Sequence, residues 1–265
     1  MSPTSTARRA YSIGASFALY LVIILGAVLL ASLVHNAVAM YIAFYALIVI
    51  LCAIIHRSRW FVSLKPYRPA TADDDSRRLS PRSFSVPTLI YLGAIISLAS
   101  SLIGFLISEK QGDPPTMTSI EIIAMLLFAP IIGPIVEELL CRATIYPMLR
   151  SSLRFTTSMV MSAAMFAAMH GNLRQGVPTF IMGLILATVY ERSHRLRDVA
   201  TIHVAHNITA FAWASISVLH HTPVWWAVPA AGACWITAMM IVASPRAPKR
   251  PLPETGDRAQ LDRGV

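Results

Sequence analysis

Residues 118–149 read TSIEIIAMLLFAPIIGPIVEELLCRATIYPML, and only four of these 32 residues carry a charge at neutral pH. A helix that spans a bilayer needs about 20 mostly apolar residues, so this stretch is long enough to cross a membrane. Pro130 and the Gly133–Pro134 pair predict a kink within it. Ionisable side chains inside a membrane span are unfavourable and usually serve a function. The stretch therefore predicts a transmembrane helix that carries a functional site.

The composition of the whole 265-residue chain agrees with this interpretation. Hydrophobic residues make up 55% of it and charged residues 13%, and the mean hydropathy is +0.60. Soluble domains carry about 25% charged residues. An ordinary soluble enzyme, a disordered protein and a disulfide-stapled secreted domain are thereby excluded. Cys52, Cys141 and Cys234 lie in or beside apolar runs, and we expect them to be free thiols.

Seven further apolar runs accompany the stretch, and together they predict an all-α fold, a polytopic transmembrane helical bundle of about eight spans. The first run has no clear cleavage site and is interpreted as an anchor rather than a signal peptide. The Trp225–Trp226 pair at the start of the last run is typical of a membrane interface. The expected spans are Tyr11–Val34, Ala37–Ile55, Val86–Ser108, Thr118–Leu140 with a continuation to Leu149, Thr157–Gly171, Pro178–Glu191, Asp198–Leu219 and Val224–Ala243.

The basic residues gather on one side of an eight-span topology. That side holds both termini and 20 of the 22 Lys and Arg residues, and only Lys110 and Arg174 fall opposite. The positive-inside rule places this side in the cytoplasm. The net charge of +9 then reflects basic loops, and their division among five segments counts against a nucleic-acid partner. Arginine outnumbers lysine 19 to 3, which is typical of GC-rich coding, so we expect an integral protein of a bacterial plasma membrane.

This topology divides the chain into five segments. We expect a cytoplasmic N-terminus at 1–10, N-terminal spans at 11–117 with a basic cytoplasmic loop at 56–85, a core at 118–220, a last span at 221–243 and a flexible cytoplasmic tail at 244–265. Most spans lack ionisable residues, whereas the fourth, fifth and seventh hold nearly all of them. The core therefore carries the candidate site.

The fourth span carries two adjacent carboxylates. Glu138 and Arg142 stand four residues apart and can pair on one helix face. Glu137 points about 100° away from Glu138, so we expect it to be the freer carboxylate and suited to act as a general base. The alternative is a helix end with ordinary surface ion pairs.

The fifth and seventh spans carry the other candidate side chains. Phe166 and His170 share a face at four-residue spacing, as do His203 and Asn207. His206 directly precedes Asn207 and is expected to face elsewhere. Interfacial histidine and hydrogen-bonded packing between helices are the alternatives. We expect the three sets to converge in the cytoplasmic half of the membrane.

Three motifs in this order, Glu-Glu-x-x-x-Arg at 137–142, Phe-x-x-x-His at 166–170 and His-x-x-x-Asn at 203–207, resemble the CAAX-protease and bacteriocin-processing (CPBP, or ABI) family. This is the family of the eukaryotic Ras-converting CAAX endoprotease. The resemblance covers residues 118–210 and implies a hydrolase, an all-helical intramembrane endopeptidase. The first three spans, the last span and the tail carry no matching motif.

The resemblance also implies roles for the motif residues. Glu137 would activate a water molecule with help from His170, and His203 and Asn207 would stabilise the oxyanion of the tetrahedral intermediate. These roles agree with what peptide hydrolysis requires, a base for water and donors for developing charge. His206 could replace His203 in a shifted frame, but the spacing to Asn207 favours His203.

The remaining motif residues would be structural or would orient the substrate. They are Glu138, Arg142 and Phe166. Cys141 adjoins the glutamate pair but has no evident base on its own face, so no Cys–His nucleophile competes with the glutamate.

The choice between a metal-free and a zinc-dependent site stays open. Glu137, His170 and His203 are the ligand types of a catalytic zinc site with an open position, although no His-Glu-x-x-His motif is present. We expect a peptide or membrane-anchored protein as the substrate, the lipid bilayer as a partner and no nucleic acid. The other hypotheses are a non-catalytic immunity or scaffold protein and a proton-coupled transporter, and the apolar outer half of the core spans counts against the transporter.

Overall fold

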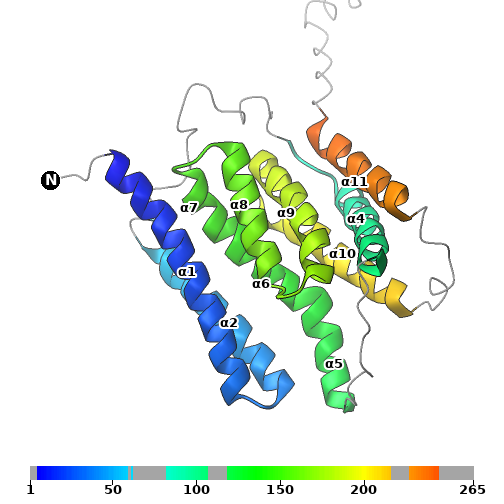
Figure 1. Cartoon of the computed structure of the whole chain (residues 1–265), viewed down its shortest axis with the longest axis horizontal. Helices are drawn as coiled ribbons and strands as arrows, with labels where there is room; N and C mark the ends of the chain where they lie inside the picture. Colours follow the sequence, from blue (N-terminus) through cyan, green and yellow to red (C-terminus); the bar gives the residue numbers. More distant parts are fainter. Residues whose placement is uncertain (1–4, 59–60, 62–81, 107–117, 216–226, 245–265) are drawn as a thin grey trace, which may run out of the picture.

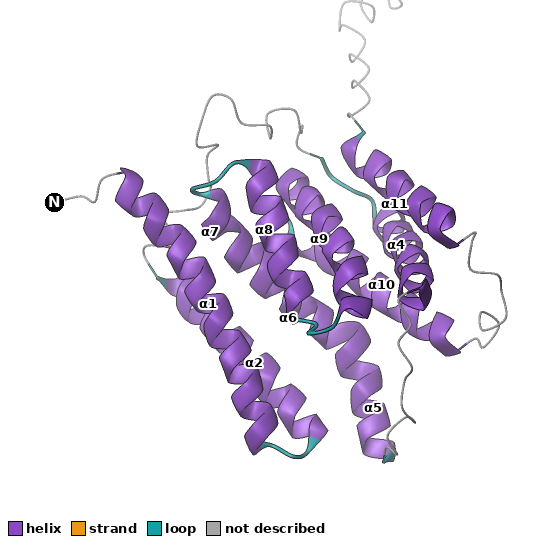
Figure 2. Cartoon of the chain, viewed as in Figure 1, coloured by secondary structure: helices purple, strands orange, loops and turns teal. Residues whose placement is uncertain are grey.

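The computed structural model describes residues 5–58, 61, 82–106, 118–215 and 227–244, and Figure 1 shows their arrangement. Every regular element within these residues is helical, and no strand occurs among them (Figure 2). The predicted all-α fold is therefore confirmed.

Eight helical rods in the described residues correspond in order to the eight predicted spans. They are α1 (Ser5–Leu33), α2 (Ala37–Arg57), α4 (Val86–Leu106), the rod α5–α7 (Ser119–Arg150), α8 (Phe155–Ala168), α9 (Leu173–Ser193), α10 (Leu196–Ser215) and α11 (Ala227–Ala243). By length and composition, five of them can cross a membrane: α1, α2, α4, the α5–α7 rod and α9. The chain is an integral membrane protein. Trp225, Trp226 and the predicted ends at Ser108 and Leu219 lie outside the described residues.

The predicted start of the sixth span at Pro178 was wrong. Helix α9 begins at Leu173, because the side chain of Asn172 accepts the backbone N–H of Gln175 and caps the helix there. Pro178 lies inside the helix instead of marking its boundary. The fifth span also ends early, since Gly171 follows α8 with a φ of 68°.

The long rod is interrupted by two π-helical turns, η2 (Phe128–Ile132) and η3 (Cys141–Ile145), which separate α5 (Ser119–Leu127), α6 (Gly133–Leu140) and α7 (Tyr146–Arg150). The first lies where the sequence predicts a kink. The Gly133 N–H bonds to the Phe128 carbonyl, five residues back, and Pro134 has no N–H. The carbonyl of Ala129 therefore loses both of its possible donors in the helix.

The core helices pack through small residues. Helix α4 crosses α10 at Gly93, where an added Cβ would lie 2.5 Å from the carbonyl oxygen of Ile202 and 2.6 Å from the Cβ of Ala205. Helix α9 meets α8 at Gly183, where an added Cβ would lie 2.9 Å from the Cβ of Ala163. Such close approach of backbones is typical of helices packed within a membrane.

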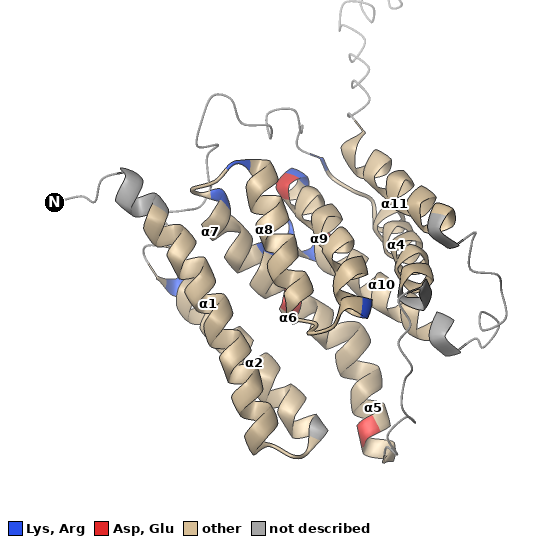
Figure 3. Cartoon of the chain, in the orientation of Figure 1, with Lys and Arg blue, Asp and Glu red and all other residues tan. Residues whose placement is uncertain are grey.

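Basic groups hold one end of the bundle together. Arg150 pairs with Glu191 at 3.1 Å, and the Tyr146 hydroxyl donates to the same carboxylate at 2.9 Å, so α7 is fixed to α9. Arg82 and Arg192 donate to backbone carbonyls at the end of α11. In Figure 3 the described Arg residues lie mostly at this end, beside α7, α8 and α9.

Candidate active site

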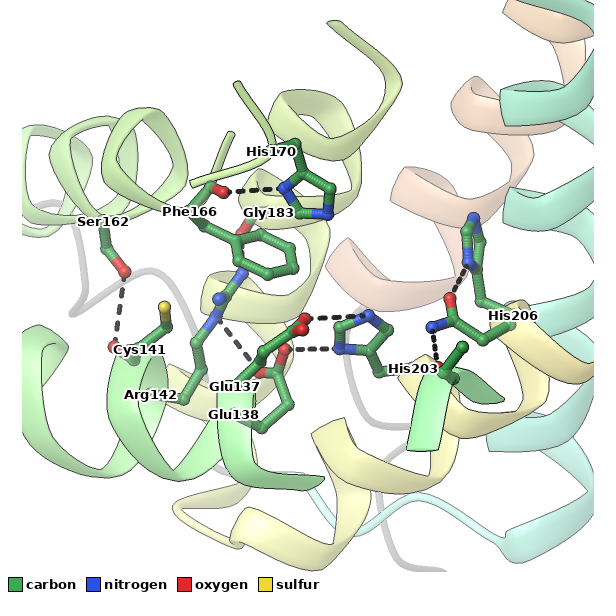
Figure 4. A network of polar contacts seen from close by, with 12 residues as sticks. Glu137, Glu138, Cys141, Arg142, Ser162, Phe166, His170, Gly183, His203 and His206 are labelled. Atoms are coloured by element: carbon green, nitrogen blue, oxygen red, sulfur yellow. Dashed lines mark hydrogen bonds and ion pairs between the residues drawn. The ribbon is translucent and has the colours of Figure 1, made fainter. Parts of the chain in front are cut away.

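Three parts of the core bring the motif residues together. Glu137 and Glu138 lie on α6 and Arg142 follows on η3, while Phe166 lies on α8 with His170 just beyond its end, and His203 and Asn207 lie on α10. In Figure 4 the two glutamates reach from the α6 side toward the ring of His203. The predicted convergence of the three motifs is thus seen in the structure.

Glu138 is the buried carboxylate at the centre of this cluster. Its side chain and that of Arg142 are both fully buried, and Arg142 Nε lies 3.3 Å from Glu138 Oε2. Arg142 also donates from Nη2 to the Gly183 carbonyl at 3.1 Å, and its guanidinium lies 4.7 Å from the centroid of the Phe166 ring. A buried ion pair is tolerated only when such additional contacts compensate for lost hydration. The predicted pairing of Glu138 with Arg142 is confirmed.

His203 lies between the two carboxylates. Its Nδ1 is 2.9 Å from Glu138 Oε1, and its Nε2 is 3.8 Å from Glu137 Oε2. An ionised carboxylate can only accept, so Nδ1 carries a hydrogen when Glu138 is paired with Arg142. The second separation is too long for a hydrogen bond. Nε2 therefore faces Glu137 and the space beside it.

Glu137 differs from its neighbour in exposure. Its side chain is 19% exposed, against 0% for Glu138. The prediction that Glu137 would be the freer of the two carboxylates is confirmed. A partly exposed carboxylate beside a histidine nitrogen can reach a water molecule or a substrate.

Phe166 joins the two histidines of the site. Its ring is fully buried, and its centroid lies 5.4 Å from that of His170 and 5.4 Å from that of His203, edge-on in both cases. His170 Nδ1 lies 3.1 Å from the Phe166 carbonyl oxygen, which can only accept, so Nδ1 is the donor. The other nitrogen of a neutral His170, Nε2, is then an acceptor.

Asn207 bonds across to the long rod. Its Nδ2 donates to the Ala129 carbonyl at 2.9 Å, and its Oδ1 lies 2.9 Å from His206 Nδ1. The expectation that His206 would face away from this network was wrong, because the ring turns back along α10 toward Asn207. Sequence reasoning also missed the Ala129 carbonyl, which the Gly133–Pro134 pair could have indicated.

The proposed zinc ligands do not form a metal site as they are placed. In the described part of the chain, no group of three or more His, Cys, Asp and Glu residues lies close enough to hold a metal ion. Both ring nitrogens of His203 face carboxylates, and His170 contacts the cluster through Phe166. Cys141 is a buried free thiol, and Cys52 and Cys234 are free as well, as predicted.

These observations define an all-helical membrane protein with a buried Glu–Arg–His cluster and one partly exposed glutamate. Residues 119–209, from α5 into α10, match the model of the Rce1-like family, type II CAAX prenyl endopeptidase Rce1-like. This segment, which holds all three motifs, is therefore similar to the type II CAAX prenyl endopeptidases of that family. No curated protein and no solved structure matches the chain.

Proposed function

We propose that this protein is an intramembrane endopeptidase that cleaves a peptide or membrane-anchored protein with a water molecule activated by Glu137 and His170. The observation that carries the proposal is that the two glutamates differ in their partners and in their exposure. Glu138 is held by Arg142 and His203, whereas Glu137 is partly exposed beside His203 Nε2. Glu138 is thereby held in place by its partners, whereas Glu137 can contact water or a substrate.

In the proposed reaction, Glu137 takes a proton from water while the water oxygen attacks the peptide carbonyl carbon. The carbonyl π electrons move to its oxygen, and the resulting oxyanion is stabilised by hydrogen-bond donors. His203 acts as an imidazolium that donates Nδ1–H to Glu138 and Nε2–H to the oxyanion. Asn207 donates its remaining Nδ2–H.

Collapse of this intermediate completes the hydrolysis. The C–N bond breaks, and the leaving nitrogen receives the proton that Glu137 took from water. His170 assists in the activation of water through its Nε2 atom, because its Nδ1 hydrogen is held by the Phe166 carbonyl. The products are a carboxylic acid and an amine, and the site returns to its starting state.

The proposed cleavage lies toward the cytoplasmic side of a bacterial plasma membrane. Glu137 precedes Arg150, at the basic end of the long rod, by 13 residues, which is about 20 Å along a helix. Its distance from the other end, Ser119, is greater. The positive-inside rule supports cytoplasmic placement of the basic end and of both termini.

The experiment that tests this proposal is peptide cleavage by the purified protein in detergent. The substrates are a peptide that ends in a prenylated CAAX sequence, its unprenylated twin and a peptide library, with cut sites mapped by mass spectrometry. Cleavage that survives a chelator and is lost in Glu137→Ala supports the metal-free mechanism. Cleavage lost in the chelator as well as in the variant supports a zinc-dependent protease. Cleavage that is unchanged in Glu137→Ala overturns the proposed role of this residue.

A second candidate is a non-catalytic immunity or scaffold protein. The observation in its favour is that Asn207 already bonds to the long rod, as a residue that only packs helices together would. This candidate predicts that no peptide is cut and that Glu137→Ala leaves the protein's cellular effect unchanged.

A further inference from the structure

A chain of hydrogen bonds leads from α4 to Asn207. The Ser100 hydroxyl on α4 lies 3.2 Å from His206 Nε2, and His206 Nδ1 lies 2.9 Å from Asn207 Oδ1. Asn207 Nδ2 lies 2.9 Å from the carbonyl oxygen of Ala129. Ser100 is outside the segment that matches the family, and neither it nor His206 belongs to the three motifs.

In this chain of hydrogen bonds, every donor points in the same direction, from Ser100 toward Ala129. A carbonyl oxygen can only accept, so Asn207 Nδ2 must be the donor to Ala129, and this fixes which way the amide is turned. Oδ1 then accepts, so His206 carries its hydrogen on Nδ1. The Nε2 of a neutral His206 is left to accept from the Ser100 hydroxyl. Each group is satisfied by the next, which is the condition for a polar network to hold one geometry.

The long rod supplies the last acceptor through its π turn. In η2 the Gly133 N–H bonds to Phe128, and Pro134 has no N–H to offer, so the Ala129 carbonyl is free of helical donors. Asn207 is the partner that satisfies it. The amide is thus held at both ends, by His206 at its oxygen and by Ala129 at its nitrogen.

We infer that Ser100 and His206 position Asn207, so that its second Nδ2–H is fixed in the direction of the substrate oxyanion. The inference rests on the proposed function of Asn207. A donor fixed before the reaction stabilises developing charge without reorganising, and this preorganisation is the main advantage of an oxyanion site. His206 is therefore a positioning residue that acts through Asn207.

A first experiment tests the positioning without any substrate. The chain contains three asparagines, Asn36, Asn172 and Asn207, so labelling with ¹⁵N-asparagine gives three side-chain amide pairs in an NMR spectrum. The pair lost in Asn207→Ala identifies the residue. We expect His206→Ala to shift or broaden the Asn207 pair and to leave the other two unchanged. An Asn207 pair that is unmoved in His206→Ala overturns the inference, whether or not cleavage has been observed.

The same spectrum supplies a matched control on α4. Ser97 lies one turn before Ser100, is buried and makes no side-chain hydrogen bond within the described residues. We expect Ser100→Ala to shift the Asn207 pair and Ser97→Ala to leave it in place. Equal effects of the two variants would indicate a general change in helix packing and contradict the inference.

A second experiment measures cleavage of the prenylated peptide by three His206 variants. Asparagine can place an N–H where His206 Nδ1 lies, whereas glutamine reaches only the position of Nε2. We therefore expect His206→Asn to keep most of the kcat, and His206→Gln and His206→Ala to lose on the order of 10-fold with KM unchanged, because the interaction strengthens in the transition state. Equal kcat in all three variants contradicts the inference.

A double-mutant cycle separates positioning from a general structural role. If His206 acts through Asn207, His206→Ala lowers kcat in the wild type but has no further effect in Asn207→Ala. Independent effects that multiply would overturn the inference. The proposed function fails by a different result, namely cleavage that is equal in the wild type and in Glu137→Ala.

Discussion

The N-terminal hairpin of α1 and α2 differs in what it buries from the core, which consists of α4, the part of the long rod from α6 to α7, α8, α9 and α10. The hairpin turns large apolar side chains outward, among them Leu25, Leu29 and Ile54, each more than half exposed within the chain. The core instead buries charges: Glu138, Arg142 and Arg150 are fully buried. In Figure 1 the hairpin lies at one edge and the core in the middle of the bundle. The outward face of the hairpin needs only to be apolar, whereas the core depends on specific partners for its buried charges.

The largest expected difference between the two regions comes from removing a partner of a buried charge. Arg142→Met leaves Glu138 without its guanidinium in a fully buried position. We expect a loss of about 3–5 kcal/mol in the free energy of unfolding, because an uncompensated charge stays in an apolar environment. The measurement is denaturant unfolding in detergent micelles. Leu29→Met on the hairpin is the control. A similar loss in both variants would contradict the claim that the core depends on specific partners more than the hairpin does.

Glycine substitutions test the same difference between the core and the hairpin. Gly93 in α4 has no room for a Cβ against the backbone of α10, whereas Gly14 in α1 has nothing within 4 Å of that position. We expect Gly93→Ala to lower the free energy of unfolding by about 1–3 kcal/mol, and Gly14→Ala to raise it by about 0.5–1 kcal/mol because alanine favours a helix. Thermal unfolding of the two variants side by side tests this. Stabilisation by both would show that α4 and α10 are not in close contact.

The smallest effect is expected at two helix caps. Asn36 caps α2 in the hairpin, and Asn172 caps α9 in the core. Replacing either with alanine should lower the free energy of unfolding by about 1 kcal/mol. Asn172 also donates from Nδ2 to the His170 carbonyl at 2.9 Å, so only Asn172→Ala should reduce peptide cleavage. Equal turnover in the two variants would mean that this bond does not hold His170 in its working position.

Much of the core could be predicted from residue spacing. The four-residue interval between Glu138 and Arg142 predicted their pairing, and it left Glu137 as the freer carboxylate. The ionisable and polar side chains gathered on three spans predicted that α6, α8 and α10 meet. The pairing follows from helix geometry, and the convergence follows from the cost of ionisable side chains inside a membrane span.

Other parts of the site depend on tertiary contacts that spacing does not contain. The Ser100–His206 bond requires α4 to lie against α10. Gly93 makes this close approach possible, but the contact exists only once the two helices have packed together. The start of α9 was misplaced because Pro178 was interpreted as a boundary, while the Asn172 cap set the true start. In both cases a side-chain contact outweighed the local pattern.

The central claim is that Glu137 performs the chemistry while Glu138 holds the structure. Its most direct test compares Glu137→Gln with Glu138→Gln for cleavage of the prenylated peptide and for thermal unfolding. We expect Glu137→Gln to abolish cleavage with an unchanged unfolding temperature, because this partly exposed side chain keeps its shape. We expect Glu138→Gln to lower the unfolding temperature, because Arg142 loses its counter-charge. Cleavage that persists in Glu137→Gln, measured on a protein that remains folded, would show that Glu137 is not the residue that activates water.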